Sequence, residues 1–308
     1  MSMSTTNARW ATWHLHLATP AQTALDRVVT RVAAPVAREL GRPWFFLRFW
    51  QAGPHVRFRV AGLDETQVEE ATHALSDLLA RQGIPLPGEP VLTEQDYAQE
   101  AQRHARGETG ADSQVAALRA PGVYPDGYVP ELERYGGAEL MAASERLFHL
   151  SSELVAALLA AEPDLARRRG LMVQLTAAAA DRLGDETDAG IFAEIGRRSW
   201  SRWASSFGYG DETVRAVLEP PASPLRLLDP RPDWLEQWVI GVDELLGRLR
   251  SAGHPRPGEV LSSHVHMTHN RLGLTILDEL RTYAVLPRSL AVREELVPDL
   301  PAGPRSAA

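Results

Sequence analysis

Residues 44–60, WFFLRFWQAGPHVRFRV, decide the fold of this 308-residue chain. The two apolar and aromatic runs at the ends of this stretch are typical of strands, and Gln51-Ala52-Gly53-Pro54 between them predicts a hairpin turn. Side chains alternate between the two faces of a strand, so His55, Arg57 and Arg59 should share one face of the second strand. We therefore expect a sheet whose apolar face packs against helices and whose other face is polar.

The segments around this hairpin predict a ferredoxin-like unit. Alternation over residues 10–17 indicates a first strand. Helices are predicted over 20–40, before the hairpin, and over 65–82, after it. A short last strand is expected near 90–92. The resulting order of strand, helix, strand, strand, helix and strand is that of a split βαβ, or ferredoxin-like, fold.

The second half of the chain has helical periodicity almost throughout. Residues 94–136 are polar and contain much Gly and Pro, which predicts a loop-rich connection with one helix over 96–106. From residue 137 onward the apolar spacing predicts a bundle of four or five helices, over 138–161, 164–183, 188–207, 233–252 and 258–286. The fold class is therefore α+β. We expect a sheet-containing unit over residues 1–93, a connection over 94–136 and a helical bundle over 137–308, together forming one compact functional domain.

The composition disfavours several kinds of site and partner. The chain contains no cysteine, which excludes disulfides, thiolate nucleophiles and zinc–thiolate sites. No stretch is long and apolar enough to cross a bilayer, and the first residues lack the pattern of a signal peptide. A formal net charge of −8 disfavours a surface built to hold nucleic acid. We expect a cytoplasmic protein without a membrane partner and without direct contact to nucleic acid.

The polar face of the predicted hairpin is the first candidate site. Arg57 and Arg59 would stand in a row with His55, and Arg48 on the preceding strand would add a third arginine. A guanidinium holds a carboxylate through paired, charge-assisted hydrogen bonds, so this row predicts an anion-binding surface. The alternative is a solvated sheet face with scattered cations.

The segment Tyr128-Val129-Pro130-Glu131-Leu132-Glu133-Arg134-Tyr135-Gly136-Gly137 is the second candidate. Arg134 and Tyr135 precede two glycines, which let the backbone bend sharply and let a ligand approach it closely. The alternative is an ordinary helix start in which Arg134 pairs with Glu131 or Glu133.

Residues 262–273, SSHVHMTHNRLG, are the third candidate. In a helix, His266 and Asn270 lie on one side, one turn apart. A metal site is disfavoured because the acids Glu259 and Asp278 are too far along the chain to complete a local one. A histidine held by a neighbouring residue as a proton-transfer base fits the segment better. The alternative is a set of histidines buried in the helical bundle.

Taken together, these segments resemble the lantibiotic dehydratase C-terminal domain, which is also known as the thiopeptide-type bacteriocin biosynthesis domain. The resemblance is carried by WFFLRFW with GPHVRFR, by PE followed by RYGG, and by HM followed by NRL, in the family's order. It covers about residues 10–286. The larger glutamylation portion of full-length dehydratases is absent, which implies a stand-alone form whose separate partner transfers glutamate from glutamyl-tRNA.

The resemblance implies a lyase that eliminates glutamate from glutamylated Ser or Thr of a precursor peptide and leaves dehydroalanine or dehydrobutyrine. It implies that Arg57, Arg59 and Arg134 hold the glutamyl group and that His266 transfers a proton, with His266, Arg134 and Arg59 as catalytic residues. Further residues are expected to bind substrate, namely Arg48, His55, Tyr135, Asn270 and Arg271. Neither a cofactor nor a metal is required. A homodimer is compatible with the sequence.

Two other functions remain open. Stand-alone relatives with this fold join two dehydroalanines in an aza-[4+2] cycloaddition that forms the pyridine of a thiopeptide, a reaction that needs positioning more than a glutamate clamp. The chain could also be a non-catalytic module that presents the precursor peptide to a partner.

Overall fold

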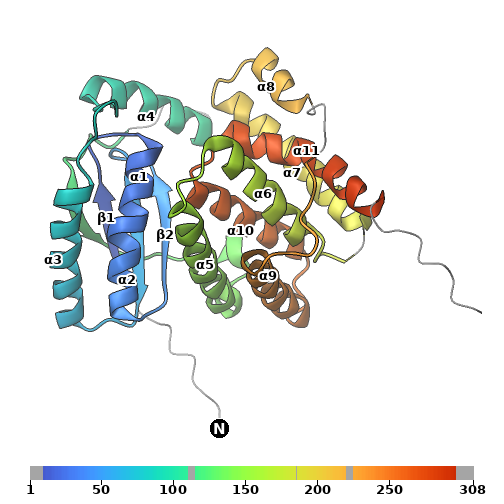
Figure 1. Cartoon of the computed structure of the whole chain (residues 1–308), viewed down its shortest axis with the longest axis horizontal. Coiled ribbons are helices and arrows are strands. Elements are labelled where there is room, and N and C mark those ends of the chain that lie inside the picture. Colours follow the sequence, from blue (N-terminus) through green and yellow to red (C-terminus); the bar gives the residue numbers. More distant parts are fainter. Residues whose placement is uncertain (1–9, 110–114, 185, 220–224, 296–308) are drawn as a thin grey trace, which may run out of the picture.

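A four-stranded antiparallel sheet forms the first half of the molecule (Figure 1). The computed structural model describes residues 10–109, 115–184, 186–219 and 225–295. The strands follow the order β2-β3-β1-β4 across the sheet. Their bounds are Trp10–His16 for β1, Trp44–Phe49 for β2, His55–Ala61 for β3 and Gly122–Asp126 for β4. This arrangement confirms the α+β class and the ferredoxin-like strand order.

The last strand lies further along the chain than the sequence predicted. Residues 90–92 form no strand; Leu92 donates a single backbone hydrogen bond to the carbonyl of Ala18. Pro90 has no N–H to donate to a ladder, and helix α4 (Glu94–Thr109) begins almost immediately. Strand β4 takes the place beside β1 instead.

One face of the sheet is covered by helices, as Figure 1 shows. The predicted helix over 20–40 is a continuous helical segment made of α1 (Gln22–Val28), a π-helical stretch η1 (Val29–Ala33) and α2 (Ala34–Leu40). Helix α3 (Glu65–Gln82) begins at Asp64 in a capping box with Gln67. Large apolar side chains fill the layer between sheet and helices, among them Trp13, Leu15, Phe46, Val56 and Phe58.

The remainder is helical, in agreement with the predicted bundle. After a 3-10 turn, η2 (Glu133–Tyr135), come α5 (Ala138–Leu159), α6 (Leu165–Ala180), α7 (Glu186–Ser206), α8 (Asp211–Leu218), α9 (Asp233–Ser251), α10 (Pro257–Leu272) and α11 (Ile276–Glu295). The single helix predicted over 258–286 is wrong, because the chain turns at Gly273, whose φ of 74° suits glycine, and divides it into α10 and α11. Helix α8 was not predicted.

Buried charges join the sheet to the bundle. The carboxylate of Asp26 on α1 accepts hydrogen bonds from Arg48 on β2, at 2.6 Å, and from Arg168 on α6. The side-chain amide of Asn270 on α10 bonds both the backbone N–H and the C=O of Arg48, at 2.9 Å each. Asn270 therefore pairs the free edge of β2 as another strand would.

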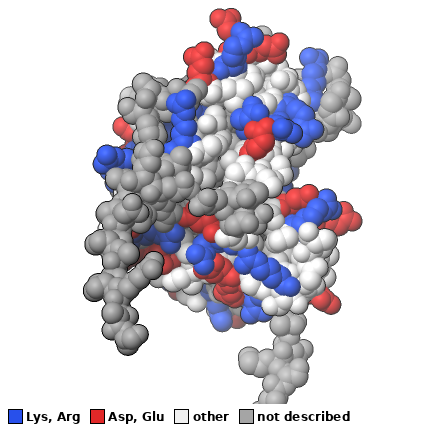
Figure 2. Space-filling model, turned by 90° about the vertical axis from the view of Figure 1, so that its right-hand side faces the viewer, with Lys and Arg blue, Asp and Glu red and all other residues white. Residues whose placement is uncertain are grey.

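On the face seen in Figure 2, cationic and anionic side chains are interspersed. Within the residues that the structure describes, no helix combines the length and the apolar character that a membrane span requires.

Candidate functional site

The sheet face opposite the helices α1–α3 carries a grid of polar side chains. The antiparallel register of β1 and β3 places Thr12 beside Arg59, His14 beside Arg57 and His16 beside His55. These residues share a face because each alternates with a buried apolar neighbour. The predicted row of His55, Arg57 and Arg59 is therefore present, and β1 extends it with residues that the sequence analysis did not select.

Arg57 and Arg59 lie over aromatic rings on this face. The guanidinium of Arg57 is 3.5 Å from the ring centre of Phe49, and that of Arg59 is 5.2 Å from Phe45 and 5.0 Å from Tyr128. Arg59 is 8% exposed, and its Nε has no hydrogen-bond partner among the described residues. Burial and then the charge of Arg57 lower the pKa of Arg59 to about 10.

A third guanidinium, that of Arg271 on α10, lies in the same region. Its Nε donates to the hydroxyl of Ser152 at 3.0 Å, but its two terminal nitrogens are buried without a partner among the described residues. Burial lowers the pKa of Arg271 to about 9; nearby Tyr135 raises it and Arg59 lowers it. Buried donors are normally bonded, so the unbonded N–H groups of Arg59 and Arg271 indicate a place for an anion.

The diglycine loop brings Arg134 and Tyr135 beside Arg271. The ring of Tyr135 packs against Phe148 and His264, with centres 4.8 and 5.1 Å apart, and the guanidinium of Arg134 lies 5.6 Å from the Tyr135 ring. Burial raises the pKa of Tyr135, whereas the charge of Arg134 lowers it.

Two observations account for residues of the diglycine loop. A hydrogen bond of 3.0 Å joins Arg134 to Glu131, so the pairing that the sequence offered as an alternative is present. Gly136 has a φ of 88°, and a Cβ there would lie 2.9 Å from Leu140. The sharp bend therefore requires glycine.

His266 lies on another side of α10 and is held by a carboxylate. Its Nδ1 is 2.9 Å from Oε2 of Glu279 on α11, and its ring packs at 4.9 Å from that of Trp200. Its side chain is 31% exposed and that of Glu279 only 3%. Glu259 and Asp278 were predicted to lie too far along the chain to complete a local site, but the turn at Gly273 brings Glu279, on the next helix, back to His266.

The described residues show no hydrogen bond or ion pair between His266 and Arg59, Arg134 or Arg271. A series of ring contacts instead runs from the hairpin to His266. Arg57 covers Phe49, and the rings then follow one another with centres 4.7–6.1 Å apart, in the order Phe49, Trp50, His104, Phe207, Trp203, Trp200 and His266.

Arg48 does not join the arginine row, and this corrects the sequence interpretation. Arg48 pairs in register with Val56, whereas Leu47 pairs with Arg57, so the side chain of Arg48 points to the opposite face. There it donates to Asp26, to Gln22 and to the carbonyl of Arg271. Together with the bond from Asn270 to the β2 edge, this gives both Arg48 and Asn270 a structural task; their predicted contact with substrate stays a prediction.

The three histidines of the sheet face form a compact group. The ring of His55 stacks between those of His14 and His16, with centres 4.7 and 4.2 Å away. Burial is the largest cause that lowers their pKa values, to about 4 for His14, about 4 for His16 and about 2 for His55. All three rings are therefore neutral at pH 7. The spacing of His14 and His16, two residues apart on a strand, was the signal that sequence reasoning passed over.

A hollow of about 460 Å³ adjoins the hairpin turn, where the hydroxyl of its lining residue Tyr97 accepts a hydrogen bond from the N–H of Ala52. It is lined by α4 and residues 115–118, with Glu94 and Tyr97 as its ionisable groups. Its lining contains none of the arginines or histidines described above. The candidate site is therefore defined by the buried guanidinium nitrogens of Arg59 and Arg271 that have no partner among the described residues.

Residues 10–291 match the protein family described as lantibiotic biosynthesis dehydratase C-term. No curated protein matches the chain significantly. Among solved structures, the chain is similar to a pyridine synthase, TbtD, from thiomuracin biosynthesis, with 18% identity and a TM-score of 0.66 over 92% of this chain and 98% of that chain.

Two further structures share the fold. The tRNA-dependent lantibiotic dehydratase MibB from Microbispora sp. 107891 has 19% identity and a TM-score of 0.53, over 96% of this chain and 29% of MibB. TsrL has 13% identity and a TM-score of 0.60, over 94% of this chain and 96% of TsrL. At these identities the likeness is one of fold.

Proposed function

The chain belongs to the family of lantibiotic biosynthesis dehydratase C-terminal domains, and on this premise we propose that it removes glutamate from glutamylated Ser or Thr side chains of a ribosomally made precursor peptide. The products are dehydroalanine from Ser and dehydrobutyrine from Thr. The partners are the precursor peptide and a separate protein that attaches glutamate from glutamyl-tRNA.

This elimination has two chemical requirements. A base takes the Cα proton of the modified residue, and the released electron pair forms the Cα=Cβ double bond while the Cβ–O bond breaks. Glutamate then departs with a new carboxylate. Cationic donors must stabilise the negative charge that develops on the peptide and on the leaving group.

The buried, unsatisfied guanidinium groups carry the proposal. Nε of Arg59 and the two terminal nitrogens of Arg271 are buried donors without partners among the residues that the structure describes. Each guanidinium lies over an aromatic ring, Arg59 over Phe45 and Arg271 over Phe148. A carboxylate placed between them would accept these donors through charge-assisted bonds. The charge of Arg57 acts on Arg59 and adds to this positive region, whereas Arg134, which lies over the ring of Tyr135, is paired with Glu131.

The hydrogen-bonded pair of His266 and Glu279 supports the requirement for a base. If Nδ1–H of His266 is donated to Glu279, the lone pair remains on Nε2, which is the arrangement of a general base. The 31% exposure of His266 leaves its ring accessible to a peptide. The proposal requires one glutamylated residue to reach both this base and the cationic group on the other side of α10.

A pyridine synthase is the second candidate. It is supported by the fold likeness to TbtD, which extends over nearly the whole length of both chains. We rank it below elimination because a cycloaddition of two dehydroalanines releases no glutamate and gives buried arginines less to bind. A module that only presents the precursor peptide would use neither the pair of His266 and Glu279 nor the guanidinium pair.

The deciding experiment offers the purified chain two substrates and weighs the products by mass spectrometry. With a peptide glutamylated on Ser, elimination removes one glutamic acid per modified residue. With a peptide that carries two dehydroalanines, a pyridine synthase forms a ring and releases the leader. Turnover of the second peptide alone would replace the proposal with cycloaddition, and turnover of neither would leave the presenting module.

Arg59→Met and Arg38→Met form a matched pair for the same assay. Arg38 is exposed on α2 and is not among the residues of the candidate site. We expect Arg59→Met to stall the glutamylated peptide and Arg38→Met to process it like the parent. Equal turnover by both variants contradicts the role of Arg59.

A further inference from the structure

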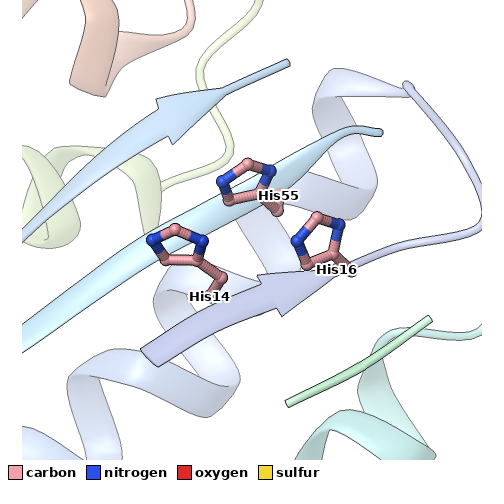
Figure 3. Close-up of side chains that lie close together, drawn as sticks. All are labelled: His14, His16 and His55. Carbon is pink, nitrogen blue, oxygen red and sulfur yellow. The ribbon is translucent and has the colours of Figure 1, made fainter. Parts of the chain in front are cut away.

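The histidine group on the sheet has the composition and spacing of a metal site. His14 and His16 extend from β1 and His55 from the adjacent β3, and Figure 3 shows their rings side by side above the two strands. One ring nitrogen from each lies within 4.8 Å of the other two. Among the described residues this is the one such group of three.

The hydrogen bonds around the group leave lone pairs available. Nδ1 of His55 lies 2.9 Å from the carbonyl of Gly53, and its Nε2 has no hydrogen-bond partner in the described part of the chain. The ring of His16 is 1% exposed, and neither of its nitrogens makes a well-formed hydrogen bond among the described residues, although the backbone of Ala52 lies close enough to raise its pKa. A buried polar atom without a partner is costly, so three such nitrogens from two rings at one place indicate a ligand.

A metal-bound histidine usually has a hydrogen bond to its second ring nitrogen, the one that does not bind the metal, and Asp126 provides this contact for His14. Its carboxylate lies 3.0 Å from Nε2 of His14, which leaves Nδ1 of His14 for a ligand. A carboxylate or carbonyl that holds the second nitrogen fixes the tautomer and orientation of a ligating imidazole. Asp126 performs this task for His14, and the carbonyl of Gly53 performs it for His55.

From this geometry we propose that His14, His16 and His55 bind one divalent transition-metal ion, for which zinc is the best-matched class. Three neutral imidazoles with a fourth position open to water or substrate make a recognised zinc set. Zinc–nitrogen bonds of about 2.1 Å in a tetrahedral site place the nitrogens about 3.3 Å apart. The rings of His14 and His16 now stack against that of His55 at interplanar angles of 28° and 23°, and imidazole lone pairs lie in the ring plane, so the rings must rotate out of this stack to direct their nitrogens at one ion.

The charges around the three histidines should weaken metal binding. The guanidinium groups of Arg57 and Arg119 lie near these rings and oppose a cation, whereas Asp126 attracts it. We therefore expect weaker binding than in a closed structural site with four protein ligands. Metal binding here does not depend on the proposed elimination, because the three histidines include neither the guanidinium groups nor the His266–Glu279 pair that carry the elimination, and the test measures metal binding.

The test uses the full chain freed of metal, with Zn²⁺ and Co²⁺ as probes. Equilibrium dialysis should give one bound zinc ion per chain, and bound Co²⁺ should show the intense visible absorption of a tetrahedral ion with nitrogen ligands. His16→Ala should abolish both signals. Since His16 makes no well-formed hydrogen bond among the described residues, this variant should keep the fold, which circular dichroism checks.

Three variants separate this site from other histidines. His73→Ala, on the exposed side of α3, and His266→Ala should bind zinc like the parent. Asp126→Ala should weaken binding about 10-fold to 100-fold, because it removes the carboxylate behind His14. The proposal is overturned if the parent shows no saturable zinc binding, or if the His16→Ala variant and the His55→Ala variant each still bind zinc. Ordered water would then be the partner of these nitrogens.

Discussion

Nδ1 of His266 lies 2.9 Å from Oε2 of Glu279, a carboxylate that is almost completely buried while the imidazole is partly exposed. The two residues lie on successive helices, α10 and α11, and the chain turns between these helices at Gly273. A buried acid behind an accessible imidazole fixes the tautomer of the ring and stabilises the imidazolium that forms when the ring takes a proton. This pair is the strongest sign of proton-transfer chemistry in the described part of the chain.

Glu279→Gln should slow elimination while it preserves the fold. The amide keeps the shape of the side chain but removes the charge that supports the protonated ring. General-base catalysis contributes about 10²-fold to 10⁴-fold to a rate, so we expect the single-turnover rate to fall by about 10²-fold or more. Quantitative mass spectrometry of the glutamylated peptide measures this rate.

The matched control is Glu259→Gln in the first turn of α10. Glu259 is exposed and pairs with Arg256, so its loss should leave turnover within a factor of about two, in keeping with the small worth of surface ion pairs. A rate that is the same in both variants would remove Glu279 from the mechanism.

Arg271→Met should make the folded protein more stable and abolish its activity. Arg271 is 1% exposed and its terminal nitrogens have no partners among the described residues, so the folded state carries the cost of an uncompensated buried charge. An apolar side chain of similar length relieves that cost, and we expect the free energy of unfolding to rise by about 1 kcal/mol. Turnover of the glutamylated peptide should be lost at the same time.

Urea denaturation and the peptide assay check the two halves of this prediction, with Arg38→Met as the exposed control for both. A destabilised Arg271→Met variant would show that the guanidinium is satisfied in the native protein. The inference of an anion site between Arg59 and Arg271 would then lose its basis.

Local patterns in the sequence predicted most of the elements but misplaced one strand. The hairpin has long aromatic runs and a clear turn, so alternation alone located β2 and β3. Strand β4 has five residues, including Pro125, and is held by pairing with β1. Such an edge strand has little signal of its own, because its stability comes from a partner that is distant in sequence.

In the candidate site, too, local sequence patterns predicted some features, whereas others depend on contacts between residues distant in sequence. Alternation predicted that Arg57 and Arg59 share a face. The side of the sheet to which Arg48 points depends on the register across the hairpin, and one residue of shift reverses it. Glu279 and Arg271 reach their places through the packing of α10 and α11, which no local pattern encodes.

Asp26→Asn should destabilise the protein in a pH-dependent way. Burial alone would raise the pKa of Asp26, but the bonds from Arg168 and Arg48 outweigh it and hold the pKa below its ordinary value. At pH 7 the variant leaves two buried arginines without their carboxylate, and we expect a loss of about 3–5 kcal/mol.

The sign of this pH dependence follows from the lowered pKa. The stabilisation by Asp26 is complete above the pKa of an unfolded aspartate, about 3.9, and is lost as the pH falls through the lower pKa of the folded state. Urea denaturation of parent and variant should therefore show a difference that narrows below about pH 4. Asp77→Asn on the exposed side of α3 should show little difference at any pH.

Two glycines on α7 should respond to alanine in opposite directions. A Cβ at Gly196 would lie 2.2 Å from the buried ring of Tyr283 on α11, whereas none of the described atoms lies within 4 Å of one at Gly190. Overpacking against a fixed ring costs about 1–3 kcal/mol, so Gly196→Ala should lower the free energy of unfolding. Gly190→Ala should raise it by about 0.5–1 kcal/mol through helix propensity. Thermal and urea denaturation compare the two variants; a neutral Gly196→Ala would show that α7 and α11 pack less closely than the structure indicates.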